Sequence, residues 1–213
     1  MALPLDGLLL GGIVLCLGIP VLLNVLGRPS GANRRAAAKK LGLEYVSESQ
    51  DGPPKTDLRP LLWADAPGRT FRFTHLIRGR LLESDVQLFD LEVRRHAGRS
   101  DYQESFQTAA LFRSDKTFPL FTLVPWKPTS PHRVDIDLPC LRAHALMAAD
   151  KAPAADLFLR LGPSFLRGTG GWLIEGGGNW VLVCRYKEIS LSDKLKDFLT
   201  EAQDIFEELR AVV

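Results

Sequence analysis

The chain has 213 residues, of which 46% are hydrophobic and 24% charged, and this composition fits one folded domain with a short extra segment. Five basic residues and one acidic residue precede position 42, so the remainder carries a slight acidic excess: Arg28, Arg34, Arg35, Lys39 and Lys40 against Asp6. A near-neutral domain without an RNA-binding aromatic motif or a recognition helix argues against nucleic acid as a partner.

An uncharged apolar run extends from Leu8 to Leu26. As a helix its 19 residues would measure about 28 Å, close to the ~30 Å hydrocarbon core of a bilayer. The run predicts one transmembrane helix, which makes residues 1–27 an N-terminal anchor. Gly7 and Gly11 form a GxxxG pair, a spacing that favours close helix contact and indicates a homodimer as one assembly state.

The alternative interpretation of this run is an export signal cleaved near Ser30, Gly31 and Ala32. A secretory signal normally begins with a basic region, whereas the opening MALPLD contains no Lys or Arg. The anchor is therefore the favoured interpretation. No Lys or Arg precedes the run and five follow it, which predicts that the C-terminal side stays in the cytoplasm and the N-terminus lies outside.

Residues 28–41 are predicted to form a basic juxtamembrane helix. Its charged residues, Arg34, Arg35, Lys39 and Lys40, recur at a spacing that directs several of them toward anionic lipid headgroups. Each such contact contributes about 1 kcal/mol to membrane binding. A plain topology signal beside the membrane explains the same charges equally well.

Residues 42–213 are expected to form an α+β domain, whose strands are predicted at 43–48, 70–79, 85–95, 104–115 and 118–126. In 70–79 the alternation places His75 and Ile77 on the face of Phe73. In 85–95 apolar residues alternate with charged ones, as expected when one face meets water: Phe89, Leu91 and Val93 against Asp90, Glu92 and Arg94. The runs 85–95 and 104–115 are predicted to pair as an antiparallel hairpin.

The C-terminal half adds helices at 140–150 and 153–161, then a hairpin over 171–186 that turns at Gly176–Asn179. A final amphipathic helix follows, with Ser190 or Ser192 able to cap its start. Its apolar stripe comprises Leu191, Leu195, Phe198, Leu199, Ala202, Ile205, Phe206 and Leu209. The predicted architecture is a mainly antiparallel sheet packed by helices and preceded by one transmembrane helix.

The chain resembles a family of uncharacterised bacterial proteins with an N-terminal hydrophobic anchor and an α+β domain of unknown function. The resemblance rests on short motifs: RG at 78–79, VQLFD at 86–90, QT at 107–108, PLFTLVP at 119–125 and WLIEGGGNWVLVCRY at 172–186. The chain differs from that family at Leu91, where an aromatic residue is usual, and in a shorter segment around 140–165. The resemblance implies an architecture and a bacterial host, and it assigns no catalytic residue. The apolar run and the charge bias then predict the bacterial cytoplasmic (inner) membrane as the location.

No catalytic, cofactor or metal motif is found in the sequence. The histidines, at 75, 96, 132 and 144, lack metal-ligand spacing, and Cys140 and Cys184 fit no CxxC pattern and are expected to be buried thiols. The glycine-rich stretch 168–178 is interpreted as a turn, because a phosphate loop requires a strand before it and a helix after it.

Two hypotheses for the function follow. The favoured one is a non-catalytic module that binds a protein partner or assists assembly at the membrane. The alternative is a membrane-tethered hydrolase that uses Asp90, Glu92 or His96, with Asp101 and Glu104 as neighbouring carboxylates. The hydrolase requires a pocket that gathers these side chains, whereas outward-pointing charges on a half-exposed sheet would need no special function.

Overall fold

The computed structural model describes residues 29–47, 69–96, 102–125, 132–136 and 144–213. The chain divides into two units, Met1–Ser30 and Gly31–Val213, and the second contains the helices and strands that the structure describes. The predicted anchor at 8–26 and the GxxxG pair lie outside the described residues. Within the described ranges, no helix is both long enough and apolar enough to cross a bilayer.

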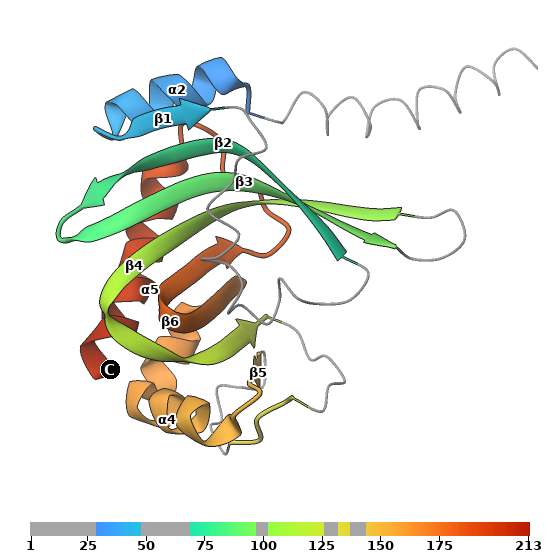
Figure 1. Ribbon diagram of the computed structural model, residues 1–213, viewed down its shortest axis with the longest axis vertical. Coiled ribbons are helices and arrows are strands. Elements are labelled where there is room, and N and C mark those ends of the chain that lie inside the picture. Colours follow the sequence, from blue (N-terminus) through green and yellow to red (C-terminus); the bar gives the residue numbers. More distant parts are fainter. Residues whose placement is uncertain (1–28, 48–68, 97–101, 126–131, 137–143) are drawn as a thin grey trace, which may run out of the picture. The chain divides into compact units, whose positions relative to one another are not determined.

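Three helices and six strands make up the described part of the second unit (Figure 1). In chain order they are α2 (Gly31–Lys40), β1 (Glu44–Ser47), β2 (Arg69–Leu81), β3 (Ser84–His96), β4 (Tyr102–Val124), β5 (Ala145–Met147), α4 (Lys151–Gly168), β6 (Trp172–Arg185) and α5 (Leu195–Val212). The strands form one antiparallel sheet in the order β1-β2-β3-β4-β5, and β6 pairs with β4. The expected α+β class, with an antiparallel sheet and a C-terminal helix, is confirmed for this unit.

Strand β4 runs without a break from Tyr102 to Val124 and so joins the described parts of 104–115 and 118–126, which were predicted as separate strands. Its first half pairs with β3 and β6, and its second half pairs with β5 and β6. Register shifts between Arg113 and Phe121 accompany a pronounced bend, which Figure 1 shows in the yellow-green ribbon labelled β4. Bulges of this kind bend a strand without ending its pairing. Strand β4 therefore connects the two halves of the sheet.

Both faces of the sheet are buried, each against its own apolar cluster. The helix-side core joins the sheet to α2, α4 and α5, and it includes Leu88 of β3 and the ring pair Phe112 and Phe206, stacked with centroids 4.8 Å apart. The opposite-face cluster contains Phe89 and Leu91 of the same strand. Because apolar side chains are buried on both faces of β3, its alternating pattern does not mark a solvated face.

A bulge in β2 between Thr74 and Ile77 changes the predicted alternation of side chains. His75 adopts a φ of 57°, in the left-handed region that residues other than glycine rarely occupy. As a result Leu76 joins Phe73 in the opposite-face cluster, while Ile77 joins the helix-side core. The prediction that Ile77 shares a face with Phe73 was therefore wrong, because one extra residue shifts the register.

The helix predicted at 140–150 is also wrong where the structure describes it. Ala145–Met147 form strand β5, in which Leu146 lies opposite Leu123 of β4. Alanine, leucine and methionine favour helices, but pairing with a long strand provides backbone hydrogen bonds and buries Leu146 to 1% exposure. Tertiary packing thus outweighs local propensity here.

The predicted hairpin at 171–186 is instead the single strand β6, which pairs with β4 along its length. A turn at Gly176–Asn179 is therefore wrong. Gly176 instead has a packing role, because a Cβ placed on it would lie 2.3 Å from the Phe121 ring. Only glycine lets the bent β4 bring that ring so close to the β6 backbone.

The two C-terminal helices follow their predicted apolar patterns. Helix α4 extends the predicted 153–161 to Lys151–Gly168, with a break at Gly162 before Pro163. Helix α5 buries the predicted stripe from Leu195 to Leu209. Leu191 is the exception, since it precedes the helix and is 45% exposed. The helix starts after Lys194 without a side-chain cap, so the serine caps were wrong.

We expect Gly176→Ala to destabilise the fold by about 1–3 kcal/mol, because the added methyl group overpacks the contact with Phe121. Urea unfolding of the full chain, followed by circular dichroism, measures the change. Gly170→Ala is the matched control, because a Cβ at that glycine meets no atom within 4 Å. Equal stability of the two variants would contradict the continuous strand and restore the turn.

Candidate functional site

Helix α2 packs on the sheet through a face of small residues that also includes one arginine. Gly31, Ala37 and Ala38 are buried there, as is Arg34, whose exposure is 1%. These positions are three to four residues apart and so lie on one side of a helix. Helix α2 therefore belongs to the compact unit Gly31–Val213, which begins before the expected domain start at residue 42.

Arg34 forms a two-pronged ion pair with Asp90 of β3. Its Nε donates to Asp90 Oδ2 at 2.9 Å, and its Nη2 donates to Oδ1 at 2.6 Å. Asp90 is 7% exposed, so both charges lie away from water. This parallel geometry is the strongest arrangement of an arginine and a carboxylate, and it orients both groups.

Thr108 of β4 completes the network and extends it to the segment before α5. Its hydroxyl donates to Asp90 Oδ1 at 2.8 Å and accepts from Arg34 Nη2 at 3.1 Å and from the Ser190 amide at 2.9 Å. The Thr108 amide donates to the carbonyl of Glu188 at 3.0 Å. Four parts of the chain thus meet around the Asp90 carboxylate and the Thr108 hydroxyl: α2, β3, β4 and the segment before α5.

Burial of Arg34 corrects one part of the predicted membrane-contact set. A guanidinium that is 1% exposed and bound to Asp90 does not reach lipid headgroups. Arg35, Lys39 and Lys40 lie on the exposed side of α2, so their contact with a membrane stays a prediction. Arg35 is also oriented by the Tyr45 ring, with its guanidinium carbon 5.1 Å from the ring centroid.

The carboxylates of β3 form neither a catalytic pocket nor a row of solvent-exposed charges, the two arrangements that the sequence suggested. Asp90 and Glu92 are buried at 7% and 8% exposure, so the expectation of outward-pointing, solvated charges was wrong. Asp90 is occupied by Arg34, and Glu92 accepts from Arg94 Nε at 2.5 Å. Neither carboxylate lines the hollow beside residues 132–136 or the hollow at the β2–β3 hairpin. These contacts give the hydrolase hypothesis no support.

The structure does not describe the side chains of the other residues named in the hydrolase hypothesis. Asp101 lies outside the described residues, and so do the side chains of His96 and Glu104. Among the residues that are described, no group of three His, Cys, Asp or Glu side chains is placed to hold a metal ion.

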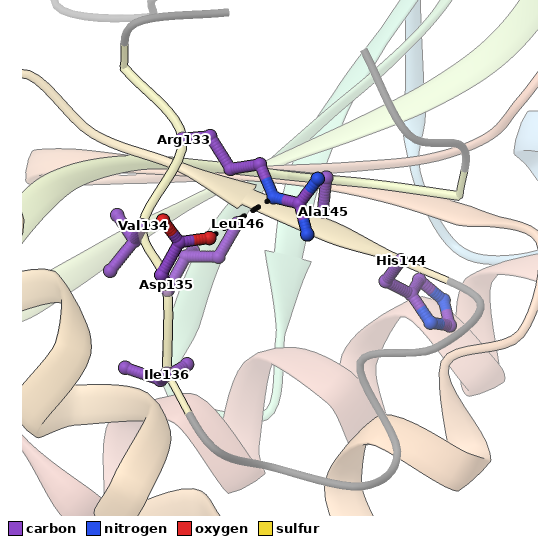
Figure 2. Close-up of a pocket in the computed structure, with 7 residues that line it drawn as sticks. All are labelled: Arg133, Val134, Asp135, Ile136, His144, Ala145 and Leu146. Atoms are coloured by element: carbon purple, nitrogen blue, oxygen red, sulfur yellow. Dashed lines mark ion pairs between the residues drawn. The ribbon is translucent and has the colours of Figure 1, made fainter. Parts of the chain in front are cut away.

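A small cavity of about 380 Å³ lies between the segment 132–136 and the start of β5 (Figure 2). Arg133 Nε and Asp135 Oδ1 are 3.4 Å apart, so the charge of the arginine is offset. His144 is 3% exposed; its Nε2 lies 3.1 Å from the carbonyl of Thr169, and its Nδ1 has no partner within the described ranges. One imidazole nitrogen and a neutralised arginine provide little basis for recognising a ligand.

The sulfur chemistry of the described part is inert. Cys184 is fully buried, and burial raises the pKa of its thiol far above its usual value, with the nearby Glu175 carboxylate adding to the effect. The thiol therefore stays protonated at neutral pH, and the expectation of a buried thiol is confirmed for this residue. Cys140 lies outside the described residues.

No protein-family model matches the chain, and no curated protein matches it by sequence. Among solved structures, the fold is similar to that of the mycobacterial trehalose monomycolate transport factor A, TtfA, with a TM-score of 0.58. The similarity covers 86% of this chain and 95% of the TtfA chain, at 14% sequence identity. The two chains therefore share a fold over most of their lengths.

We expect Arg34→Met and Asp90→Leu each to destabilise the fold by about 3–5 kcal/mol, since each leaves one buried charge unpaired. The double variant should be much more stable than the sum of the two losses predicts, because no unpaired charge remains. Urea unfolding of the full chain measures this double-mutant cycle.

The surface pair Arg210 and Asp115, 3.0 Å apart, is the matched control. Its arginine lowers the pKa of the exposed Asp115 carboxyl, so its small contribution is present at neutral pH and lost as pH falls through that lowered pKa. If Arg34→Met and Asp90→Leu lower the free energy of unfolding no more than Arg210→Met and Asp115→Leu do, the buried pair does not hold α2 on the sheet.

Proposed function

We propose that this chain is a non-catalytic accessory factor for the transport of an envelope lipid in a bacterium. Its fold is similar to that of a protein whose name states a role in trehalose monomycolate transport. The proposal takes from that name only the general class of cargo, a lipid of the cell envelope. It also retains the favoured sequence hypothesis of a module that works through a protein partner at the membrane.

The fold similarity carries the transport role, and the attachment of α2 to the sheet supports the part of the proposal that places the chain at a membrane surface. The helix follows the apolar run 8–26 after a few residues, and the Arg34–Asp90 pair joins it to β3. A helix fixed in this way holds its outer side, with Arg35, Lys39 and Lys40, in a set orientation relative to the sheet. We infer that these three side chains bind anionic headgroups, each contributing about 1 kcal/mol.

The proposed location is the bacterial cytoplasmic (inner) membrane. We infer a single-pass protein with its N-terminus outside and the unit Gly31–Val213 in the cytoplasm. Support comes from the length of the run 8–26 and from the basic residues that follow it. A homodimer formed through Gly7 and Gly11 stays a prediction from the sequence.

Depletion of the chain in its bacterium is expected to leave a newly made envelope lipid in the inner membrane, as measured by pulse labelling and membrane fractionation. Wild-type chain should restore export of the lipid. A triple charge reversal, Arg35→Glu, Lys39→Glu and Lys40→Glu, should restore it poorly, because repulsion replaces headgroup binding on the exposed side of α2.

The matched control reverses three exposed charges on other helices, Lys151, Arg167 and Lys196, and should restore export fully. Unchanged lipid distribution after depletion would reject the transport role itself. Normal export with the α2 variant would reject only the headgroup contact. Immunoblotting confirms equal amounts of each variant.

The topology has its own test, protease treatment of a C-terminal tag in intact spheroplasts and after lysis. We expect protection before lysis and digestion afterwards, with the N-terminal Met1 or Ala2 retained in the membrane fraction. Digestion in intact spheroplasts would place the unit Gly31–Val213 outside the cytoplasm and overturn the charge-bias argument. A new N-terminus near Ala32 would instead indicate a cleaved export signal.

A further inference from the structure

An open hollow of about 760 Å³ lies on the sheet at the end formed by the β2–β3 hairpin. We name it the arginine groove, and it is lined by Arg78, Gly79, Arg80, Asp85, Val86, Gln87, Arg113, Asn179 and Trp180. These residues come from β2, β3, β4 and β6, and the hollow adjoins the opposite-face cluster through Trp180. Helix α2 contributes no residue to it.

The arginines of the groove lack carboxylate partners. Arg78, Arg80 and Arg113 form no ion pair with any residue that the structure describes, although Arg80 Nη2 donates to the backbone carbonyl of Glu83 at 3.4 Å. The same lack of an ion pair holds for scattered exposed arginines such as Arg72 and Arg167, so the distinguishing feature is that three such arginines line one hollow. Asp85 is the single carboxylate in the lining, so the groove carries an excess of two positive charges. Gathering like charges on one sheet face is unfavourable unless an anion offsets them.

The groove is also partly preorganised. The guanidinium carbon of Arg113 lies 5.8 Å from the centroid of the Trp180 ring, a cation–π contact that limits its motion. Arg78 Nε and Gln87 Oε1 are buried atoms that have no hydrogen-bond partner within the described ranges. Arg78 and Gln87 face each other across β2 and β3. The groove thus has one donor, Arg78 Nε, and one acceptor, Gln87 Oε1, that a ligand can bind beside the positive charges.

Strand geometry allows the three arginines to act on one group. Arg78 and Arg80 are two residues apart on β2, about 7 Å along the strand, and β4 lies two strand spacings away, about 10 Å. Arginine binds phosphate through two parallel hydrogen bonds, and three such side chains surround a tetrahedral anion better than a planar carboxylate. A phosphate monoester carries between one and two negative charges near neutral pH, which balances the excess in the groove.

We propose that the arginine groove binds a phosphate monoester of a polyol, such as a glycerol phosphate. Arg78, Arg80 and Arg113 hold the phosphate oxygens, and Gln87 Oε1 accepts a hydrogen bond from a hydroxyl group of the organic part. Trp180 supplies an apolar surface beside that part. This binding site goes beyond the proposed transport role and does not depend on it, because its lining excludes α2.

The test is calorimetric titration of the full chain in neutral detergent with glycerol 3-phosphate and, separately, with a short-chain phosphatidic acid. We expect saturable binding of at least one of them. The double variant Arg80→Gln and Arg113→Gln should weaken that binding by about tenfold or more, since two charge-assisted contacts are lost. Both residues are exposed, so the fold should tolerate the change.

The matched control, Arg72→Gln with Arg167→Gln, removes two exposed arginines that do not line the groove, one of them on β2 as well. It should change the affinity by less than about twofold. Saturable binding of glycerol 3-phosphate, no weaker than that of the lipid, identifies a soluble ester as the ligand, whereas binding confined to phosphatidic acid identifies a lipid headgroup. Absence of saturable binding, or an equal loss in both double variants, overturns the proposal.

Discussion

The ion pair between Arg34 and Asp90 is the constraint on which the rest of the described structure depends. It places a full charge from α2 against the middle of β3, in a position closed to water. The Thr108 hydroxyl donates to the same Asp90 carboxylate and accepts from the Ser190 amide. The network therefore joins β4 and the segment before α5 to the ion pair between α2 and β3. Buried charges are costly when unpaired, and this network therefore penalises any arrangement in which α2 leaves the sheet.

Burial of both sheet faces explains why the charged residues of β3 have structural rather than solvent-facing roles. The helix-side core and the opposite-face cluster leave Asp90 and Glu92 little access to water. Each is matched by an arginine, and those matches remove the two carboxylates from consideration as free acid–base groups. In contrast, the three arginines of the arginine groove have no such match within the described residues, and they gather in one hollow where a ligand can reach them.

Periodic patterns in the sequence predicted much of the fold. The alternation in β3, the antiparallel partner in β4 and the stripe of α5 all have the periods that the structure shows. The errors occur where a long-range partner decides the conformation. Ala145–Met147 form a strand because β4 lies beside them, and Gly176 of β6 makes room for the Phe121 ring instead of forming a turn. Neither partner is close in sequence, so local propensity carries no information about it.

The buried network was harder to predict, although its parts were visible in the sequence. Gly31, Ala37 and Ala38 mark a small-residue side of α2 that also includes Arg34, whereas the charges alone suggested a surface helix. Asp90 and Thr108 lie in the VQLFD and QT motifs on which the family resemblance rests. The arginine groove was missed because its residues come from four strands, and the pairings of β2 with β3, β3 with β4 and β4 with β6 bring them to one surface.

The pairing of β4 also has a consequence for the order in which the protein folds. Strand β6 joins β4 only after residues 172–185 have been synthesised, and Ser190 reaches Thr108 later still. Contacts this distant along the chain form slowly, because a long loop closes before they gain any stability. During synthesis, α2 therefore emerges well before its binding surface is complete. Until the C-terminal residues leave the ribosome, Arg34 and Asp90 lack part of the surrounding structure that excludes water, and chaperones have an interval in which to engage the unfinished sheet.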